Sequence, residues 1–116
     1  MGMEAMVSAV LWPLTAGRVY LDVAPSGAVR PFITLRAAGG TPITFLDGTI
    51  PAKEIVRVEV SVWGSGRADA ADVGKKVEDA LRAATALQTT VLTGRSAIID
   101  SATQIPVMLQ EFEIFV

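Results

Sequence analysis

Two carboxylates near the C-terminal end of the sequence are the first residues whose spacing could support chemistry. Glu111 and Glu113 alternate with Phe112 in a segment predicted as a strand, so both carboxylates fall on one face, about 6.5–7 Å apart. Carboxyl groups at such a separation can act as an acid/base pair. The neighbouring sequence predicts no substrate cleft, and alternating charges usually mark the solvated face of a strand. We therefore favour a pair that faces solvent or a partner.

Two glycine motifs resemble fragments of phosphate-binding loops. Gly64-Ser65-Gly66 lies between a predicted strand and a predicted helix, where such a loop would sit. Asp69 occupies the place of the third glycine of the dinucleotide fingerprint, and its charge would repel a pyrophosphate. Gly74-Lys75-Lys76 lacks the upstream glycine and the hydroxyl residue of a P-loop and falls inside a helix. Both motifs are interpreted as structural.

The sequence contains no histidine and no cysteine. This composition excludes disulfides, Cys/His zinc sites, thiol nucleophiles and imidazole-based triads. Tyr20, Ser61 and Lys53 carry side chains that other proteins use in catalysis, but none has a companion residue at a motif spacing. We therefore expect no catalytic residues, no cofactor and no metal site.

The charge balance and the hydropathy pattern exclude two kinds of partner. Lysine and arginine number 10 against 12 acidic residues, whereas a protein that binds nucleic acid usually carries a clear basic surplus. No apolar run approaches the ~20 residues of a membrane span. Glu4 and Pro13 do not fit a signal peptide. We expect neither a membrane nor a specific nucleic acid as partner.

The clearest predicted element is a strand over residues 55–63. Its four valines, at positions 56, 58, 60 and 62, alternate with mostly polar residues, which predicts one buried face rich in β-branched side chains. A helix is predicted over 67–87, because Val73, Val77, Leu81 and Ala84 form an apolar stripe at helical spacing.

The remaining elements complete an α+β domain. The predictions are a short helix from Met3 that ends at Pro13, strands over 18–23, 32–38, 96–100 and 107–116, and either a loop or a short strand over 88–93. The order α-β-β-β-α-β-β, over a single domain spanning 1–116, predicts one mostly antiparallel sheet with the helices packed on one face.

The chain holds more large apolar residues than a small core readily accommodates, since 51% of its residues are hydrophobic. Trp12, Trp63 and Phe115 are the hardest to place in a monomer, and exposed aromatic residues often mark protein–protein contacts. The long segment 39–53 adds three more apolar residues, which either dock on a neighbouring molecule or fold back on their own sheet as a hairpin. The candidate interface residues are Ile43, Phe45, Leu46, Trp12, Trp63 and Phe115.

The succession of short motifs along the chain resembles the tail-completion, or tail-terminator, proteins of long-tailed bacteriophages, prophages and gene-transfer particles. After the N-terminal helix come Gly17-Arg18-Val19-Tyr20, Ala24-Pro25, Pro31-Phe32-Ile33-Thr34, Leu46-Asp47-Gly48, the strand 57–63, the alanine-rich helix ending in Ala80-Leu81, and Phe112-Glu113-Ile114-Phe115.

The resemblance implies a structural, non-enzymatic virion protein. Such proteins form a ring, often hexameric, on the head-proximal end of the tail tube, where the ring stops polymerisation and meets the head connector. The expected partners are therefore further copies of the chain, the tail-tube protein and the head–tail connector protein, and the expected location is the virion, with the host cytoplasm during assembly.

Three alternatives stay open on the sequence alone. The chain could be a small α+β binding or regulatory module that is dimeric through its sheet, or another component of the head–tail neck. A cofactor-free enzyme that uses Tyr20 or a carboxylate is the weakest of the three.

Overall fold

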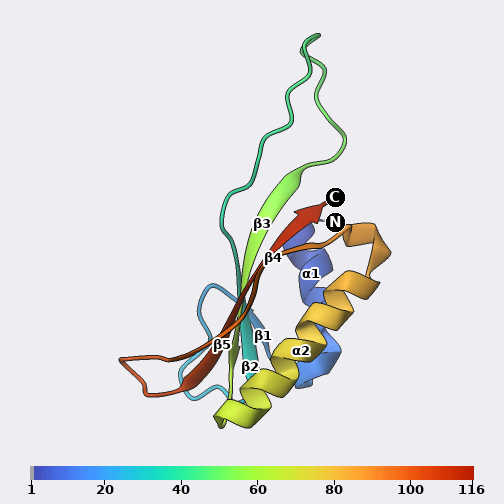
Figure 1. Ribbon diagram of the computed structural model, residues 1–116. Helices are drawn as coiled ribbons and strands as arrows, with labels where there is room; N and C mark the ends of the chain where they lie inside the picture. The colour runs from blue at the N-terminus through green and yellow to red at the C-terminus, as the bar shows by residue number, and fades with distance from the viewer. Residues whose placement is uncertain (1) are drawn as a thin grey trace.

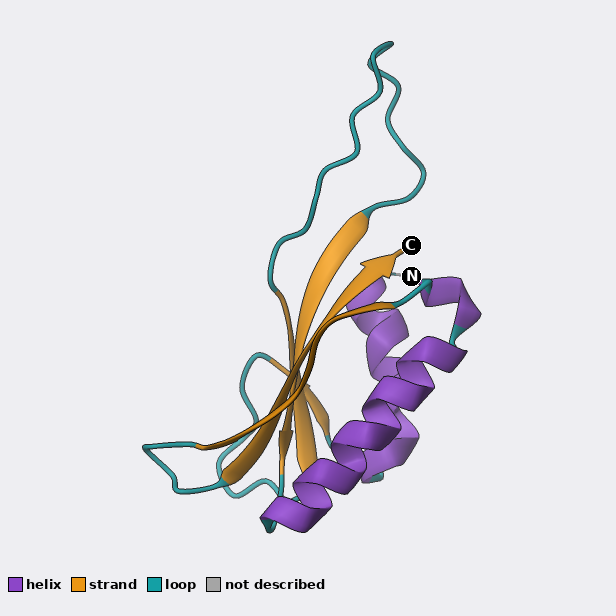
Figure 2. Ribbon diagram, in the orientation of Figure 1, coloured by secondary structure: helices purple, strands orange, loops and turns teal. Residues whose placement is uncertain are grey.

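A five-stranded sheet with two α-helices on one face forms the body of the protein (Figures 1 and 2). The computed structural model describes residues 2–116. Helix α1 spans Met3–Leu11 and continues as a 3₁₀ turn over Trp12–Thr15, and helix α2 spans Arg67–Ala83. The strands are β1 (Val19–Leu21), β2 (Phe32–Ala37), β3 (Ile55–Trp63), β4 (Thr90–Ile99) and β5 (Pro106–Phe115). The predicted fold class and element order are confirmed.

The strand order is β1-β2-β3-β5-β4, and every neighbouring pair is antiparallel except β1 with β2. Strand β3 lies in the centre. It pairs with β5 along its whole length, from Ile55 opposite Phe115 to Trp63 opposite Val107. The sheet is thus mostly antiparallel, as predicted.

The hydrophobic core lies between this sheet and the two helices. Val58, Val60 and Val62 of β3 are completely buried there, as their alternation predicts, while Val56 is half-buried. Further core side chains come from both helices and from the neighbouring strands: Val7, Leu11, Ile33, Leu35, Val73, Val77, Leu81, Phe112 and Ile114.

Helix α2 ends four residues before the predicted boundary. Ala84 leaves the helical conformation, with φ −79° and ψ 86°, and a 3₁₀ turn over Thr85–Leu87 follows. The turn places Leu87 in the core, where it is 1% exposed. Leu87, the last residue of the predicted helix, is therefore buried from a 3₁₀ turn and not from the α-helix.

Strand β4 is the largest departure from the prediction. It is one continuous strand over Thr90–Ile99, whereas the sequence predicts an ambiguous stretch followed by a strand from Ser96. Its register with β5 shifts twice, between Val91 and Thr93 and between Thr93 and Ser96. Such bulges interrupt the two-residue alternation, and β4 lies at the sheet edge with nearly all of its side chains exposed.

Residues 38–54, here called the arm, join β2 to β3 and extend far beyond the end of the sheet (Figure 1). The arm contributes to a molecule that measures 51 × 26 × 25 Å. Its radius of gyration, 14.9 Å, exceeds the roughly 13 Å typical of a compact chain of this length.

Candidate assembly interface

The base of the arm is fixed to the sheet by backbone hydrogen bonds. Ala38 N–H donates to the carbonyl of Arg57 at 2.7 Å, and Arg57 N–H donates to the carbonyl of Gly39 at 2.8 Å. Gly40 passes so close to the adjoining strand that a Cβ there would collide with the carbonyl oxygen of Ile55. On the other side, Glu54 and Val116 exchange backbone hydrogen bonds. The two chain segments of the arm therefore leave the body from a defined point.

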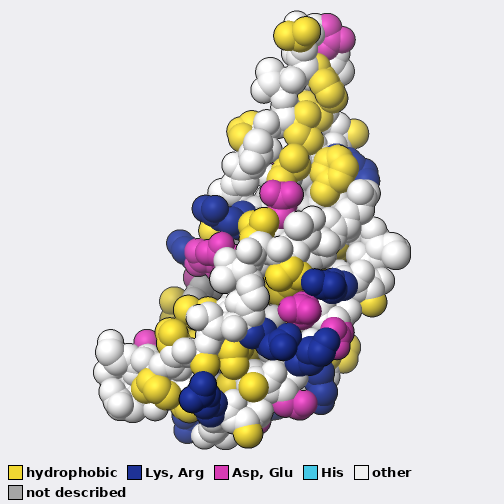
Figure 3. Space-filling view, viewed as in Figure 1, with side chains coloured by type: hydrophobic (Ala, Val, Ile, Leu, Met, Phe, Trp, Pro, Cys, Tyr) yellow, Lys and Arg dark blue, Asp and Glu magenta, His cyan; other side chains and the backbone are white. Residues whose placement is uncertain are grey.

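The tip of the arm is a turn that displays apolar side chains. Gly48 N–H donates to the carbonyl of Phe45 at 3.1 Å, and Thr49 N–H donates to Asp47 Oδ1 at 2.9 Å. Hydrogen bonding to Thr49 lowers the pKa of Asp47, so this carboxylate is ionised at neutral pH. Phe45 is 46% exposed and Leu46 is fully exposed. Hydrophobic side chains gather along the arm in the space-filling view (Figure 3).

The apolar residues of the arm tip therefore do not fold back on the sheet. The hairpin alternative would have placed Phe45 and Leu46 on that surface. Ile43 is half-buried, and with Ile50 it lines a hollow of about 500 Å³ between the arm and the start of α1.

The two tryptophans lie in different environments. Trp12, where α1 passes into the 3₁₀ turn, is 53% exposed, and its ring covers Gly17, where a Cβ would lie only 2.9 Å from Trp12 Cε2. Trp63 is half-buried: its ring stacks on Phe32 at 5.7 Å, and its Nε1 donates to Thr34 Oγ1 at 3.0 Å.

Phe115 lies at the base of the arm. It pairs across the sheet with Ile55, and the ammonium group of Lys53 lies 4.9 Å from the centre of its ring. The six predicted interface residues thus fall into separate regions: the arm with its base, the junction after α1, and the far end of β3.

That far end of β3 forms a hollow that the sequence analysis did not predict, here called the aromatic groove. Its volume is about 710 Å³. Phe32, Thr34 and Trp63 line it on the sheet, and the loop after β1 and the turn before β5 complete it. The loop residues are Asp22, Val23, Ala24, Pro25, Ser26, Gly27, Ala28 and Arg30, and the turn residues are Thr103 and Ile105. Of the residues singled out in the sequence, the interface candidate Trp63 lines the groove, and so do parts of the motifs Ala24-Pro25 and Pro31-Phe32-Ile33-Thr34.

Comparison with known proteins identifies the family. The sequence model described as "Tail completion protein gp17" matches residues 5–116. The chain belongs to this family. Among solved structures, it is similar to a chain of the "Virion of native gene transfer agent (GTA) particle", with a TM-score of 0.56 and 19% identity over 93% of this chain and 84% of that one. At this identity the likeness shows a shared fold. No curated protein matches the sequence.

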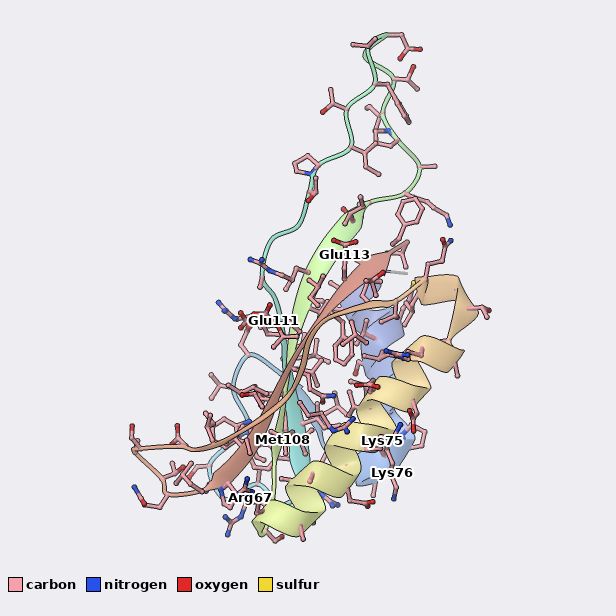
Figure 4. All side chains as sticks on the ribbon, viewed as in Figure 1. Arg67, Lys75, Lys76, Met108, Glu111 and Glu113 are labelled. Atoms are coloured by element: carbon pink, nitrogen blue, oxygen red, sulfur yellow. The ribbon has the colours of Figure 1, made fainter. Side chains whose placement is uncertain are left out.

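In this tail completion family member, the open face of the sheet carries a row of charged side chains. Arg36 Nη2 lies 2.6 Å from Glu59 Oε2, and Glu59 lies directly opposite Glu111 in the register. Glu111 and Glu113 follow one another along β5, as predicted, and Glu111 accepts a long hydrogen bond of 3.5 Å from Thr93 (Figure 4). Neither glutamate lines the aromatic groove or the hollow at the arm.

The glycine turn before α2 is closed by the aspartate that argued against a phosphate loop. Asp69 accepts hydrogen bonds from the backbone N–H groups of Ser65 and Gly66, each at 2.9 Å. Burial alone would raise the pKa of Asp69, but the donors from Gly66 and Ser65 together lower it. In this tail completion family member, the Asp69 carboxylate thus occupies the backbone N–H groups that a phosphate would have to bind.

No group of three or more acidic residues within residues 2–116 is arranged to hold a metal ion. None of the helices in that part of the chain is both long enough and apolar enough to cross a membrane.

Proposed function

We propose that this protein is a structural component of a phage-type tail that closes the head-proximal end of the tail tube as a ring. The ring, which we expect to be a hexamer, stops tube polymerisation and offers a surface to the head–tail connector. The chain acts in it as one tail-terminator-like domain over 1–116, in the virion and, during assembly, in the host cytoplasm. Membership of the tail completion family and the fold shared with a gene transfer agent virion chain support this function.

The observation that carries the proposal is the projecting arm. An isolated monomer gains nothing from a fully exposed leucine beside a half-exposed phenylalanine at the end of a long extension. At about 25 cal/mol per Å², burial of Phe45 and Leu46 against another subunit contributes several kcal/mol before ordering costs. In a closed ring, every subunit repeats this contact.

A tube-growth assay tests the function directly. Added to polymerising tail-tube protein from the same particle, the protein should bind one end of each tube and shorten the tubes. The Phe45→Ser, Leu46→Ser double variant should lose this effect. The matched control, Thr41→Ser with Thr44→Ser, changes the same arm without removing an apolar side chain and should retain it. Tubes of unchanged length with the unmodified protein would contradict capping.

A dimer formed through the sheet is the competing arrangement, because β4 leaves one edge of the sheet unpaired. Ile98 and Ile99 on this edge are 42% and 56% exposed, and unpaired apolar edges invite strand pairing. A lysine in place of Ile98 would block such a dimer, since charge at an edge disfavours pairing, and would leave an arm-mediated ring intact. The solution mass of this variant separates the two arrangements.

A further inference from the structure

The aromatic groove and the arm lie at opposite ends of the same two strands. The arm leaves β2 after Ala37 and returns to β3 at Ile55, whereas Phe32 and Trp63, paired at the other end of the register, line the groove. Figure 1 shows the arm extending from one end of the sheet and the loops beside the groove at the other. The molecule therefore presents a projecting apolar tip and an apolar hollow at opposite ends of β2 and β3.

The sheet side of the groove is preformed for apolar side chains. The Phe32 and Trp63 rings stack with an interplanar angle of 14°, and Tyr20 packs edge-on against Phe32 at 5.8 Å. The indole N–H already donates to Thr34, so an apolar occupant leaves no polar group of Trp63 unpaired. Val23, beside it, is 79% exposed.

We propose that the aromatic groove receives the arm tip of a second copy of this chain. Phe45 and Leu46 would rest on the stacked rings. Such contacts between two different patches generate a closed ring when the rotation between subunits closes. The inference rests on the proposed ring and names the surface that accepts the arm.

Charge supports this choice of occupant. Asp47 is the one charged residue between Gly39 and Ala52, and it stands beside the two apolar residues of the tip. Arg30 lines the groove and makes no ion pair within residues 2–116. The other charged residue of the lining is Asp22; the pKa of Arg36 is raised chiefly by its hydrogen bond and ion pair with Glu59, and Asp22 adds a smaller charge effect. Arg30 is thus a cation of the groove, without an ion-pair partner in residues 2–116, that Asp47 of a second copy could pair with.

Disulfide trapping tests the contact, because the chain contains no cysteine. A Leu46→Cys, Ala24→Cys variant should form a ladder of covalent oligomers up to the full ring when oxidised with diamide. The control pair, Leu46→Cys with Ala83→Cys, places the second thiol on the exposed end of α2. At about 10 µM protein, docked thiols should cross-link about a hundredfold faster than the control pair, because docking raises their effective concentration to about 1 mM.

Fluorescence of Trp63 gives a second readout in a Trp12→Phe background, where Trp63 is the only tryptophan. Assembly should shield Trp63 from acrylamide, and Phe45→Ser should weaken assembly by about tenfold or more, the loss expected for one buried aromatic side chain. A ring that forms without the 24–46 disulfide and without shielding of Trp63 overturns the groove contact and leaves the proposed function standing. A chain that stays monomeric under all these conditions overturns both.

Discussion

Single side chains in this protein stabilise the fold at places where the sequence also suggests chemistry. Asp69 occupies the backbone donors of Ser65 and Gly66 at the start of α2, and Gln110 connects the sheet to the same helix. Both residues are polar and at least partly buried, and each forms a hydrogen bond to the backbone. At this scale, the motifs that resemble active-site fragments serve helix capping and core packing.

Replacing Asp69 with alanine should lower the free energy of unfolding by about 1 kcal/mol at pH 7, the usual effect of losing a helix-capping side chain. The folded protein lowers the pKa of Asp69 below the ordinary 3.8, so its stabilising effect is complete above 3.8 and is lost as the pH falls through the lower folded value. Urea denaturation at several pH values should show that the difference in unfolding free energy between Asp69→Ala and the unmodified protein shrinks as the pH falls below 3.8.

The matched control is Asp72→Ala, which removes a carboxylate from the same helix; this carboxylate forms an exposed ion pair with Lys76. Its effect should be smaller at pH 7, because exposed ion pairs contribute little. Equal losses in the two variants would contradict the capping role of Asp69.

Replacing Gln110 with methionine should leave stability within about 1 kcal/mol of the original or raise it. The Gln110 side chain is 2% exposed and donates to the carbonyl of Gly74 at 3.0 Å, but its Oε1 has no partner in the described structure. Methionine fills the same volume and removes the unpaired oxygen. Gln110→Ala instead leaves a cavity and should cost about 2–4 kcal/mol. The melting temperatures of both variants test this prediction. If Gln110→Met lowers the melting temperature as much as Gln110→Ala, the hydrogen bond to Gly74 is essential for stability.

At the scale of elements, strands with regular alternation are predictable from the sequence, and irregular ones are not. The bounds of β3 match the prediction because its valines alternate without interruption between two paired neighbours. The bulges of β4 remove that periodicity, and its exposed position imposes no apolar face. The aromatic groove depends on contacts among three separate segments, so no local pattern could reveal it.

Replacing Val58 with aspartate should prevent folding. Val58 is completely buried, and an unpaired carboxylate there costs at least about 5 kcal/mol, comparable to the whole stability of a small protein. Circular dichroism during heating should show no cooperative transition. Thr44→Asp adds the same charge to the exposed arm and should melt like the unmodified protein. A soluble Val58→Asp protein that melts cooperatively would mean that the inward face of β3 is wrongly assigned.

At the scale of the whole molecule, the protein consists of a packed body and an arm that packs little against it. The body contains the core between sheet and helices, whereas the arm exposes Phe45, Leu46 and Ile50 at some distance from that core. The sequence predicts the arm's existence and its apolar residues. Its direction depends on the hydrogen bonds at its base and on the close approach of Gly40 to β3, which are tertiary contacts. The elongated shape then provides the two different ends that a closed ring requires.

The mass of the protein in solution, measured by light scattering over a range of concentrations, tests the ring most directly. We expect the unmodified chain to approach the mass of a closed ring, for which the family resemblance implies six subunits. The Phe45→Ser, Leu46→Ser variant should remain a monomer with an unchanged melting temperature, because both side chains are exposed in the isolated chain. A ring mass that the double variant retains, or an unmodified protein that stays monomeric or stops at a dimer, would contradict assembly through the arm.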